Sequence, residues 1–182
     1  RSKASRKTDF YTRWLLQAVL SAQHLHSARD SYTEKKLRAA GINNVINTGC
    51  PTLWPLSPEH CENVPKKAGK DAVLVLTDYS RNDRDRHLLQ VTLANYRNVY
   101  FWPQGEGDIR YALSLPGGDQ LKILPRNLAG YDALLSDRGL SLDYVGTRLH
   151  GGIRALQHGR RTVIIGVDHR ANAMGRDFNL PV

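Results

Sequence analysis

Short apolar runs alternate along the chain with stretches whose apolar residues recur at helical spacing. The runs predict strands at His24–Arg29, Asn44–Asn47, Ala72–Thr77, Asn98–Trp102, Leu121–Leu124, Leu142–Val145 and Thr162–Val167. The spaced stretches predict helices at Thr8–Leu20, Ser31–Gly41, Asp85–Tyr96, Asp108–Leu115, Asn127–Arg138 and Arg148–Gln157. Strands that alternate with helices are typical of a parallel sheet with right-handed crossovers. The pattern therefore predicts an α/β protein with a doubly wound, mostly parallel sheet.

Two local signals indicate where elements of this pattern begin and end. Ser31-Tyr32-Thr33-Glu34 has the form of a capping box, and Gly41 is placed to end the helix that follows it. The stretch 51–69 contains four prolines and many polar residues, so it is expected to be a long connection. The 182 residues suit one domain, and we expect a single domain over residues 1–182.

Cysteine content and hydropathy exclude several classes of protein. Two cysteines, Cys50 and Cys61, are too few for a disulfide framework, and no cysteine pair has metal-binding spacing, so no metal is expected. The apolar runs are far too short to span a bilayer. The polar start, Arg1 to Asp9, does not resemble a signal peptide. These features predict a cytoplasmic protein in a reducing compartment.

The net charge of +9, from 26 Lys and Arg against 17 Asp and Glu, favours an anionic partner. A phosphorylated metabolite, a nucleic acid and an acidic membrane surface all satisfy that condition. Nucleic acid is the least expected of the three, because no basic surface interleaved with aromatic residues and no recognised motif is present.

Polar residues follow the predicted strands in a recurring way. Parallel sheets bind ligands beyond the carboxyl ends of their strands. Arginine, histidine and glycine are concentrated there, in Arg29-Asp30, Asp78–Arg81, Gln104–Gly107, Gly146–His150 and Asp168–Arg170. A surface with a purely structural role would scatter these residue types more evenly, so this edge of the sheet is the predicted functional edge.

The segment from Gly146 to Gly152 carries the most chemistry. Thr147 is suited to cap a helix that begins with Arg148, Leu149 and His150. Amides at a helix N-terminus and a guanidinium together form an anion site, and a histidine there can transfer protons near neutral pH. Two adjacent glycines, which are poor helix formers, suggest a close approach by backbone or ligand. The alternative is that His150 packs under the sheet edge while Arg148 is solvated.

The segment 145–156, Val-Gly-Thr-Arg-Leu-His-Gly-Gly-Ile-Arg-Ala-Leu, resembles the signature segment of the polysaccharide pyruvyl transferases. The likeness continues in Thr162–Asp168, which His169-Arg170-Ala171 follows, and upstream in Ser27–Thr33 and Gly49–Trp54. It runs from about Ser27 to Pro181, and the Arg-Leu-His segment is its most specific part.

The resemblance implies a Rossmann-like fold, similar to the C-terminal domain of a GT-B transferase. The glycine-rich opening of a first half is absent, so the chain is expected to be the second half of a two-domain enzyme. Members of the family transfer the enolpyruvyl group of phosphoenolpyruvate to two hydroxyls of a sugar. They form a pyruvate ketal in capsule or exopolysaccharide biosynthesis, on a sugar or lipid-linked oligosaccharide at the inner face of the membrane. Phosphoenolpyruvate is the donor substrate, and no cofactor is implied.

The resemblance also assigns roles to individual residues. It makes His150 the expected catalytic acid or base, and Arg29, Arg148, Leu149 and Arg170 the expected substrate-binding residues. Arg170 stands where relatives commonly carry lysine. An arginine keeps the charge but is a poor proton donor, so its expected role is electrostatic. For Arg29 the alternative is an ion pair with Asp30 or Glu34, and for Arg170 it is a solvated loop position.

Weaker candidates lie elsewhere in the chain. The segment Gln104–Asp108 is either an acceptor-binding loop or, the preferred reading, a glycine-rich turn into a helix with acidic residues at its start. A basic group is either a solvated face or a substrate contact; its members are Arg81, Arg84, Arg86 and His87. Trp54 and Trp102 are expected in the core rather than stacked on a sugar.

Two other functions stay open. The first is a GT-B glycosyltransferase with a nucleotide-sugar donor, although no convincing pair of glutamates lies near Arg148. The second is a domain that binds glycan or phosphate without catalysis. Donor binding separates the first from a pyruvyl transferase, and turnover separates the second. The oligomeric state is left open.

Overall fold

The computed structural model describes residues 8–182, so residues 1–7 of the polar start lie outside the described part. Its contacts divide the chain into two compact units, 1–54 with Asp168–Leu180, and Pro55–Val167 with Pro181–Val182. This division does not test the prediction of one domain over residues 1–182, which stays a prediction. In the described part of the chain, no helix is both long and apolar enough to cross a bilayer.

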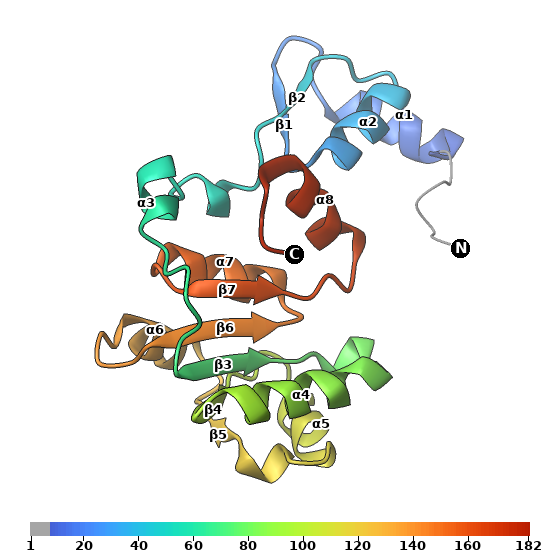
Figure 1. Cartoon of the computed structure of the whole chain (residues 1–182). Helices are drawn as coiled ribbons and strands as arrows, with labels where there is room; N and C mark the ends of the chain where they lie inside the picture. Colours follow the sequence, from blue (N-terminus) through green and yellow to red (C-terminus); the bar gives the residue numbers. More distant parts are fainter. Residues whose placement is uncertain (1–7) are drawn as a thin grey trace. The chain divides into compact units, whose positions relative to one another are not determined.

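The unit Pro55–Val167 is built on a five-stranded, entirely parallel sheet (Figure 1). Its strands are β3 (Asp71–Val75), β4 (Asn98–Phe101), β5 (Lys122–Ile123), β6 (Leu142–Gly146) and β7 (Arg161–Ile164). They lie in the order β5-β4-β3-β6-β7. The chain therefore moves from β3 in one direction to β5, and then crosses to β6 and moves in the other direction. The point at which the order reverses lies between β3 and β6, where ligands bind in sheets of this kind.

Helices cover both faces of this sheet, with α4 and α5 on one side and α6 and α7 on the other (Figure 1). Their bounds are α4 (Asp83–Asn95), α5 (Asp108–Ser114), α6 (Leu128–Ser136) and α7 (Leu149–Gln157). A short helix, α3 (Pro58–Glu62), precedes β3, and 3₁₀ turns lie at η3 (Asp78–Ser80) and η4 (Gly118–Gln120). The predicted Rossmann-like, doubly wound fold is thereby confirmed.

The central strands β3 and β6 are buried on both faces because helices cover both. All five residues of β3 and all five of β6 are buried. Leu74 and Leu76 pack with Leu89 of α4 and Tyr111 of α5 in one core cluster. On the other face, Trp102 stacks on Tyr131 of α6, with ring centroids 3.8 Å apart and planes 6° from parallel. The central sheet is thus fixed from both sides, which makes its carboxyl edge a rigid platform.

In its described residues, the other unit contains a two-stranded parallel sheet and three helices. The strands are β1 (His26–Ala28) and β2 (Val45–Asn47), paired from His26 with Val45 to Ala28 with Asn47. The helices are α1 (Phe10–Val19), α2 (Ser31–Ala39) and α8 (His169–Phe178), and the turn η2 (Pro51–Leu53) follows β2. The hydroxyl of Ser31 donates to Asp177 at 2.8 Å, which fixes the start of α2 against α8.

The predicted strands and helices are found, most within three residues of their expected bounds. The helix α8 was not predicted, although Ala171 and Met174 are spaced on one buried face and Asp168 caps its start. The connection 51–69 was predicted without structure and contains η2 and α3. The core position expected of Trp102 is confirmed, whereas Trp54 is 65% exposed and that prediction was wrong.

The capping box predicted at Ser31–Glu34 was wrong by one residue. Asp30 is the N-cap of α2, and its carboxylate accepts from the Thr33 amide at 2.7 Å. Aspartate is as good a cap as serine. The predicted end of the helix is confirmed, because Gly41 has a φ of +93° and the Ile42 amide donates to Leu37.

Candidate functional site

Three loops meet at the carboxyl edge of the central sheet, after β3, β4 and β6. Because β3 lies between β4 and β6 in the sheet, the loop after β3 separates the other two. The pairing of β3 with β6 continues past the strands, as the Thr147 amide donates to the Val75 carbonyl at 2.9 Å. Thr77 and Arg148, each two residues beyond its strand, therefore occupy corresponding positions at the point where the strand order reverses.

Asp108 connects the three loops. Its side chain is completely buried at the first position of α5 and accepts hydrogen bonds from the amides of Asp78, Gln104 and Gly105, at 3.0, 3.0 and 2.6 Å. Its fourth partner is the Arg148 guanidinium, whose Nη2 lies 2.8 Å from Oδ2. One carboxylate thus accepts donors from all three loops.

The charge state of Asp108 follows from this set of donors. Burial raises the pKa of the Asp108 carboxyl, but the three backbone hydrogen bonds and the charge of Arg148 outweigh burial and hold the pKa below its ordinary value of 3.8. Asp108 is therefore an anion at neutral pH, and Arg148 is its cationic partner.

Gly105 leaves room for the ion pair in this loop. A Cβ on Gly105 would lie 3.1 Å from Oδ1 of Asp108 and 3.3 Å from Nη2 of Arg148. A larger residue would therefore push into the ion pair. The preferred reading of the segment Gln104–Asp108, a glycine-rich turn into a helix with acidic residues at its start, is confirmed.

Arg148 is held on two sides. One nitrogen contacts Asp108, and the guanidinium carbon lies 4.8 Å from the centroid of the Tyr79 ring. The side chain is only 16% exposed. The alternative in which Arg148 is solvated was therefore wrong.

Two polar atoms at this edge are buried without a partner. Nε of Arg148 and Oγ1 of Thr77 have no hydrogen-bond partner among the residues that the structure describes. Buried polar groups are nearly always satisfied, so each of these atoms needs a partner that the described residues do not supply. A guanidinium nitrogen donates, and a hydroxyl donates or accepts, so the oxygen of an anion is one kind of partner that suits either atom.

The start of α7 differs from the sequence prediction. Arg148, not Thr147, is the N-cap, and the helix begins at Leu149. The Thr147 hydroxyl is directed at the Val75 carbonyl, 3.4 Å away. No side chain caps α7, so its first-turn amides are not taken up by a capping group.

Tyr144 and Tyr131 hold the first turn of α7 against the sheet and α6. The Tyr144 hydroxyl donates to the Arg148 carbonyl at 2.7 Å, and the Tyr131 hydroxyl donates to the Gly151 carbonyl at 2.9 Å. Burial raises the pKa of Tyr144 far above its usual range, so this hydroxyl keeps its proton. The turn that carries Arg148, Leu149 and His150 is therefore rigid.

The three consecutive candidates have three different environments. Arg148 is half-buried, Leu149 is buried at 7% exposure, and His150, the second residue of α7, is exposed. The alternative in which His150 packs under the sheet edge was wrong. The side chain of Leu149 contributes to packing, so only its backbone amide is suited to contact a ligand.

The glycines Gly151 and Gly152 are explained by packing. A Cβ on Gly152 would lie 2.5 Å from Cγ1 of Ile164, and one on Gly151 would lie 3.0 Å from the Tyr144 hydroxyl. The close approach expected from the sequence is present, and its partners are side chains of the sheet.

Arg29 and Arg170 belong to the unit that contains α2 and α8, and they have similar surroundings. Nε of Arg29 lies 3.2 Å from Asp30, and Nη2 of Arg170 lies 2.5 Å from Asp168. Asp30 caps α2 and Asp168 caps α8, so Arg29 pairs with the cap of the helix that follows it and Arg170 pairs with the cap of its own helix. Arg29 forms the ion pair that was the alternative to substrate binding, and its partner is Asp30. Glu34 pairs with Arg38 instead. The substrate-binding roles of Arg29 and Arg170 stay predictions.

Sequence reasoning missed Asp108 as the partner of Arg148 and missed Thr77, and it placed Tyr79 at the functional edge without assigning it a contact. A signal for Asp108 was present, because an acidic residue and an arginine both follow predicted strands of one sheet. The strand order, which brings the three loops together, is not encoded in the local pattern. In the described residues, no cluster of His, Cys, Asp and Glu could hold a metal ion.

The fold and the site define a Rossmann-like α/β protein with a partly buried Arg148–Asp108 ion pair at the reversal of its strand order. Residues 5–169 match the family model of the polysaccharide pyruvyl transferases. The chain belongs to that family. It therefore belongs to a class of transferases that act on polysaccharide. No curated protein and no solved structure gives a match to the chain.

Proposed function

We propose that this protein transfers the enolpyruvyl group of phosphoenolpyruvate to a sugar and forms a cyclic pyruvate ketal. The observation that carries the proposal is Arg148: a half-buried guanidinium, oriented by Asp108, with an unsatisfied Nε beside the uncapped start of α7. Membership of the pyruvyl transferase family supports the reaction type. Capsule or exopolysaccharide assembly at the cytoplasmic face of the membrane is the proposed setting.

The donor carries a phosphate and a carboxylate, and both need cationic or amide partners. Arg148 supplies a guanidinium, and the amides of Leu149 and His150 lie at the positive end of α7. Because one nitrogen of Arg148 is bonded to Asp108, the guanidinium cannot rotate freely and presents its remaining N–H groups in a fixed direction. Arg29 and Arg170 remain further proposed contacts to the donor.

His150 is the proposed acid–base residue. A proton must reach the methylene carbon of the donor, which makes the adjacent carbon electrophilic. One sugar hydroxyl then adds to the electrophilic carbon, which carries the phosphate. A second hydroxyl of the sugar displaces the phosphate from the same carbon, and each hydroxyl loses its proton to a base. An exposed imidazole two residues after Arg148 in the chain is suited to exchange these protons with a bound substrate and with water.

Calorimetric titration of the chain with phosphoenolpyruvate tests the donor. Arg148→Ala should weaken binding by about tenfold or more, because a charge-assisted hydrogen bond contributes about 1.5–3 kcal/mol. Arg110→Ala, at an exposed position of α5, is the matched control and should bind like the unmodified chain.

Turnover tests the reaction. With phosphoenolpyruvate and a panel of sugars, we expect phosphate release together with a new ketal methyl signal in the proton spectrum. His150→Ala should lose turnover while it keeps donor binding. Saturable binding of a nucleotide sugar in place of phosphoenolpyruvate would instead indicate the glycosyltransferase. Donor binding without any turnover would indicate a binding domain.

A further inference from the structure

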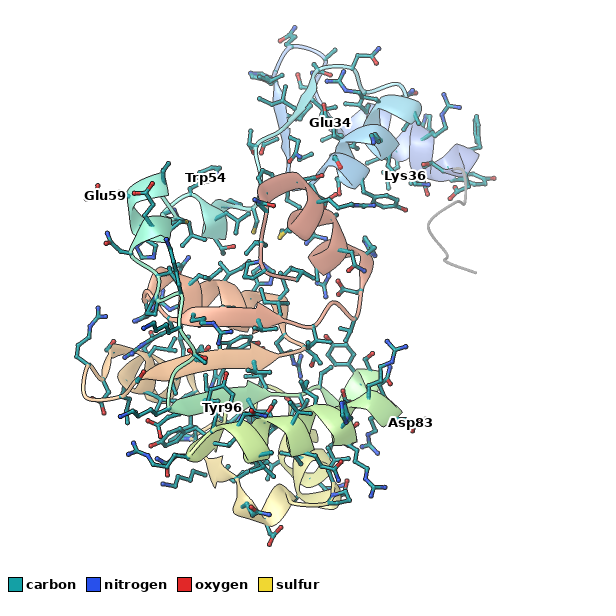
Figure 2. The ribbon with its side chains drawn as sticks, in the orientation of Figure 1. Glu34, Lys36, Trp54, Glu59, Asp83 and Tyr96 are labelled. Carbon is teal, nitrogen blue, oxygen red and sulfur yellow. The ribbon has the colours of Figure 1, made fainter. Side chains whose placement is uncertain are left out.

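A cavity of about 520 Å³ lies in the unit Pro55–Val167, near the start of α4. Its volume is in the range of small-ligand sites. The residues that line it come from the loop after β3, from α4 and from the end of α5: Arg81, Asn82, Asp83, Arg86, Tyr111 and Leu115. Figure 2 labels Asp83 at the end of α4 toward which the arrows of the central sheet point. The cavity is therefore at the same edge as Arg148.

Arg81 is held in place at the wall of this cavity. Its Nε donates to the Asp78 carbonyl at 3.2 Å, and its guanidinium carbon lies 4.9 Å from the centroid of the Tyr111 ring. The Tyr111 ring is itself fixed, because its hydroxyl donates to the buried Asp85 at 2.6 Å. Burial and the charge of Asp85 raise the pKa of Tyr111 to about 12, so the ring stays neutral beneath the cation.

The lining of the cavity has a positive formal charge, because it contains two arginines and one carboxylate, Asp83. In residues 8–182, neither Arg81 nor Arg86 forms an ion pair, although Asp83 lines the same cavity. Both arginines are exposed, so their guanidiniums are accessible to an anionic ligand. Phosphate and carboxylate groups are the partners that match such an arrangement.

One short loop links this cavity to the Arg148 centre. In the turn η3, Asp78 donates its amide to Asp108 and Tyr79 contacts the Arg148 guanidinium. Arg81 follows directly after the turn. A ligand in the cavity would thus lie near a ligand at Arg148. A donor and an acceptor must lie near each other in this way for the group to be transferred.

We propose that this cavity binds an anionic group of the sugar acceptor, with Arg81 and Arg86 as its cationic contacts. The proposal rests on the proposed function, since it places the acceptor beside a donor at Arg148. Asp83 and the Nδ2 group of Asn82, whose Oδ1 caps α4, are the proposed contacts to sugar hydroxyls. The anionic group is either the diphosphate of an activated or lipid-linked sugar or the carboxylate of an acidic sugar.

The test is calorimetric titration of the full chain with three probes: inorganic pyrophosphate, methyl glucuronide and the neutral methyl glucoside. We expect one of the two anions to bind saturably, and its identity distinguishes the two sources. Arg81→Gln and Arg86→Gln should each weaken that binding about tenfold, as expected for the loss of a charge-assisted contact. Arg84→Gln is the matched control, because Arg84 is an exposed arginine of α4 that does not line the cavity.

Titration of the same variants with phosphoenolpyruvate separates this proposal from the proposed function. We expect Arg81→Gln and Arg86→Gln to bind phosphoenolpyruvate like the unmodified chain. The acceptor site is overturned if neither anion binds while phosphoenolpyruvate does. It is also overturned if both variants weaken phosphoenolpyruvate as strongly as they weaken the probe, because the cavity would then hold the donor. Anion binding at the cavity in a chain that binds no phosphoenolpyruvate would instead overturn the proposed function.

Discussion

The Nη2 atom of Arg148 lies 2.8 Å from Oδ2 of Asp108, and this pair connects the loop after β6 to the loop after β4 across the end of β3. Such a pair contributes little net stability, because both groups lose their hydration when they are buried. The pair instead holds the Arg148 guanidinium in one position. A guanidinium that is fixed before the ligand arrives loses less conformational entropy on binding.

Asp108→Asn should destabilise the protein by about 3 kcal/mol, the cost of leaving one member of a buried ion pair without its partner. The amide would also place N–H donors against a pocket whose protein partners are all donors. Urea unfolding at neutral pH measures the change. Asp119→Asn, at an exposed position of η4, is the control and should change stability by less than about 0.5 kcal/mol. Equal stability of both variants would show that the pair is not buried in solution.

The stabilisation that Asp108 provides should depend on pH in the acid range. Its pKa is below the ordinary 3.8 in the folded chain, so the charged form is favoured by folding. The stabilising effect is therefore fully present above the unfolded-state pKa and is lost as pH falls through the lower, folded-state pKa.

Urea unfolding of the unmodified chain and of Asp108→Asn at several pH values measures this dependence. The difference in unfolding free energy should be constant from about pH 7 to pH 5 and should shrink below about pH 4. Since other carboxylates with lowered pKa are present in both proteins, the difference isolates Asp108. A difference that grows on acidification would contradict the assigned direction of the pKa shift.

The sequence predicted the fold class because its signals are local. The alternation of short apolar runs with amphipathic stretches reports burial on both faces of a sheet, and β3 and β6 are buried throughout. Strand order is not a local property. The neighbours of β3 are β4 and β6, and only that order brings Asp108 to Arg148.

Caps were the least accurate local prediction. Thr147 and Ser31 were expected to cap helices, whereas Arg148 and Asp30 occupy those positions. In both cases a neighbouring acceptor offers the hydroxyl another partner: the Val75 carbonyl for Thr147 and the Asp177 carboxylate for Ser31. These partners are distant in sequence, so no local pattern could have revealed them.

Tyr79→Ala should weaken phosphoenolpyruvate binding by a few-fold, because it removes the ring beside the Arg148 guanidinium. Cation–π contacts at partly exposed sites contribute about 0.5–1 kcal/mol. Tyr79→Phe is the matched control, since it keeps the ring and should retain the affinity. The expected effect is on binding and not on folding, as the Tyr79 side chain is 65% exposed. Equal losses in both variants would assign the contribution to the hydroxyl.

Gly152→Ala should destabilise the protein by about 1–3 kcal/mol, the usual cost of an added methyl group in a packed interior. The new Cβ would lie 2.5 and 2.8 Å from two carbons of Ile164 and 3.0 Å from Cε1 of Tyr144. Both neighbours are buried, at 1% and 0% exposure, so neither can move away without disturbing the sheet. The helix α7 would have to shift, and with it the turn that carries Arg148.

Thermal and urea unfolding measure the cost, and Gly139→Ala is the control. A Cβ on Gly139 would meet only Oδ1 of the exposed Asp137, at 3.1 Å, and the hydrogen bond that this oxygen accepts from the Gly139 amide is exposed to solvent. We therefore expect a loss for Gly152→Ala and little change for Gly139→Ala. A Gly152→Ala protein with unchanged stability and weakened phosphoenolpyruvate binding would mean that this glycine is needed for close approach of a ligand rather than for packing.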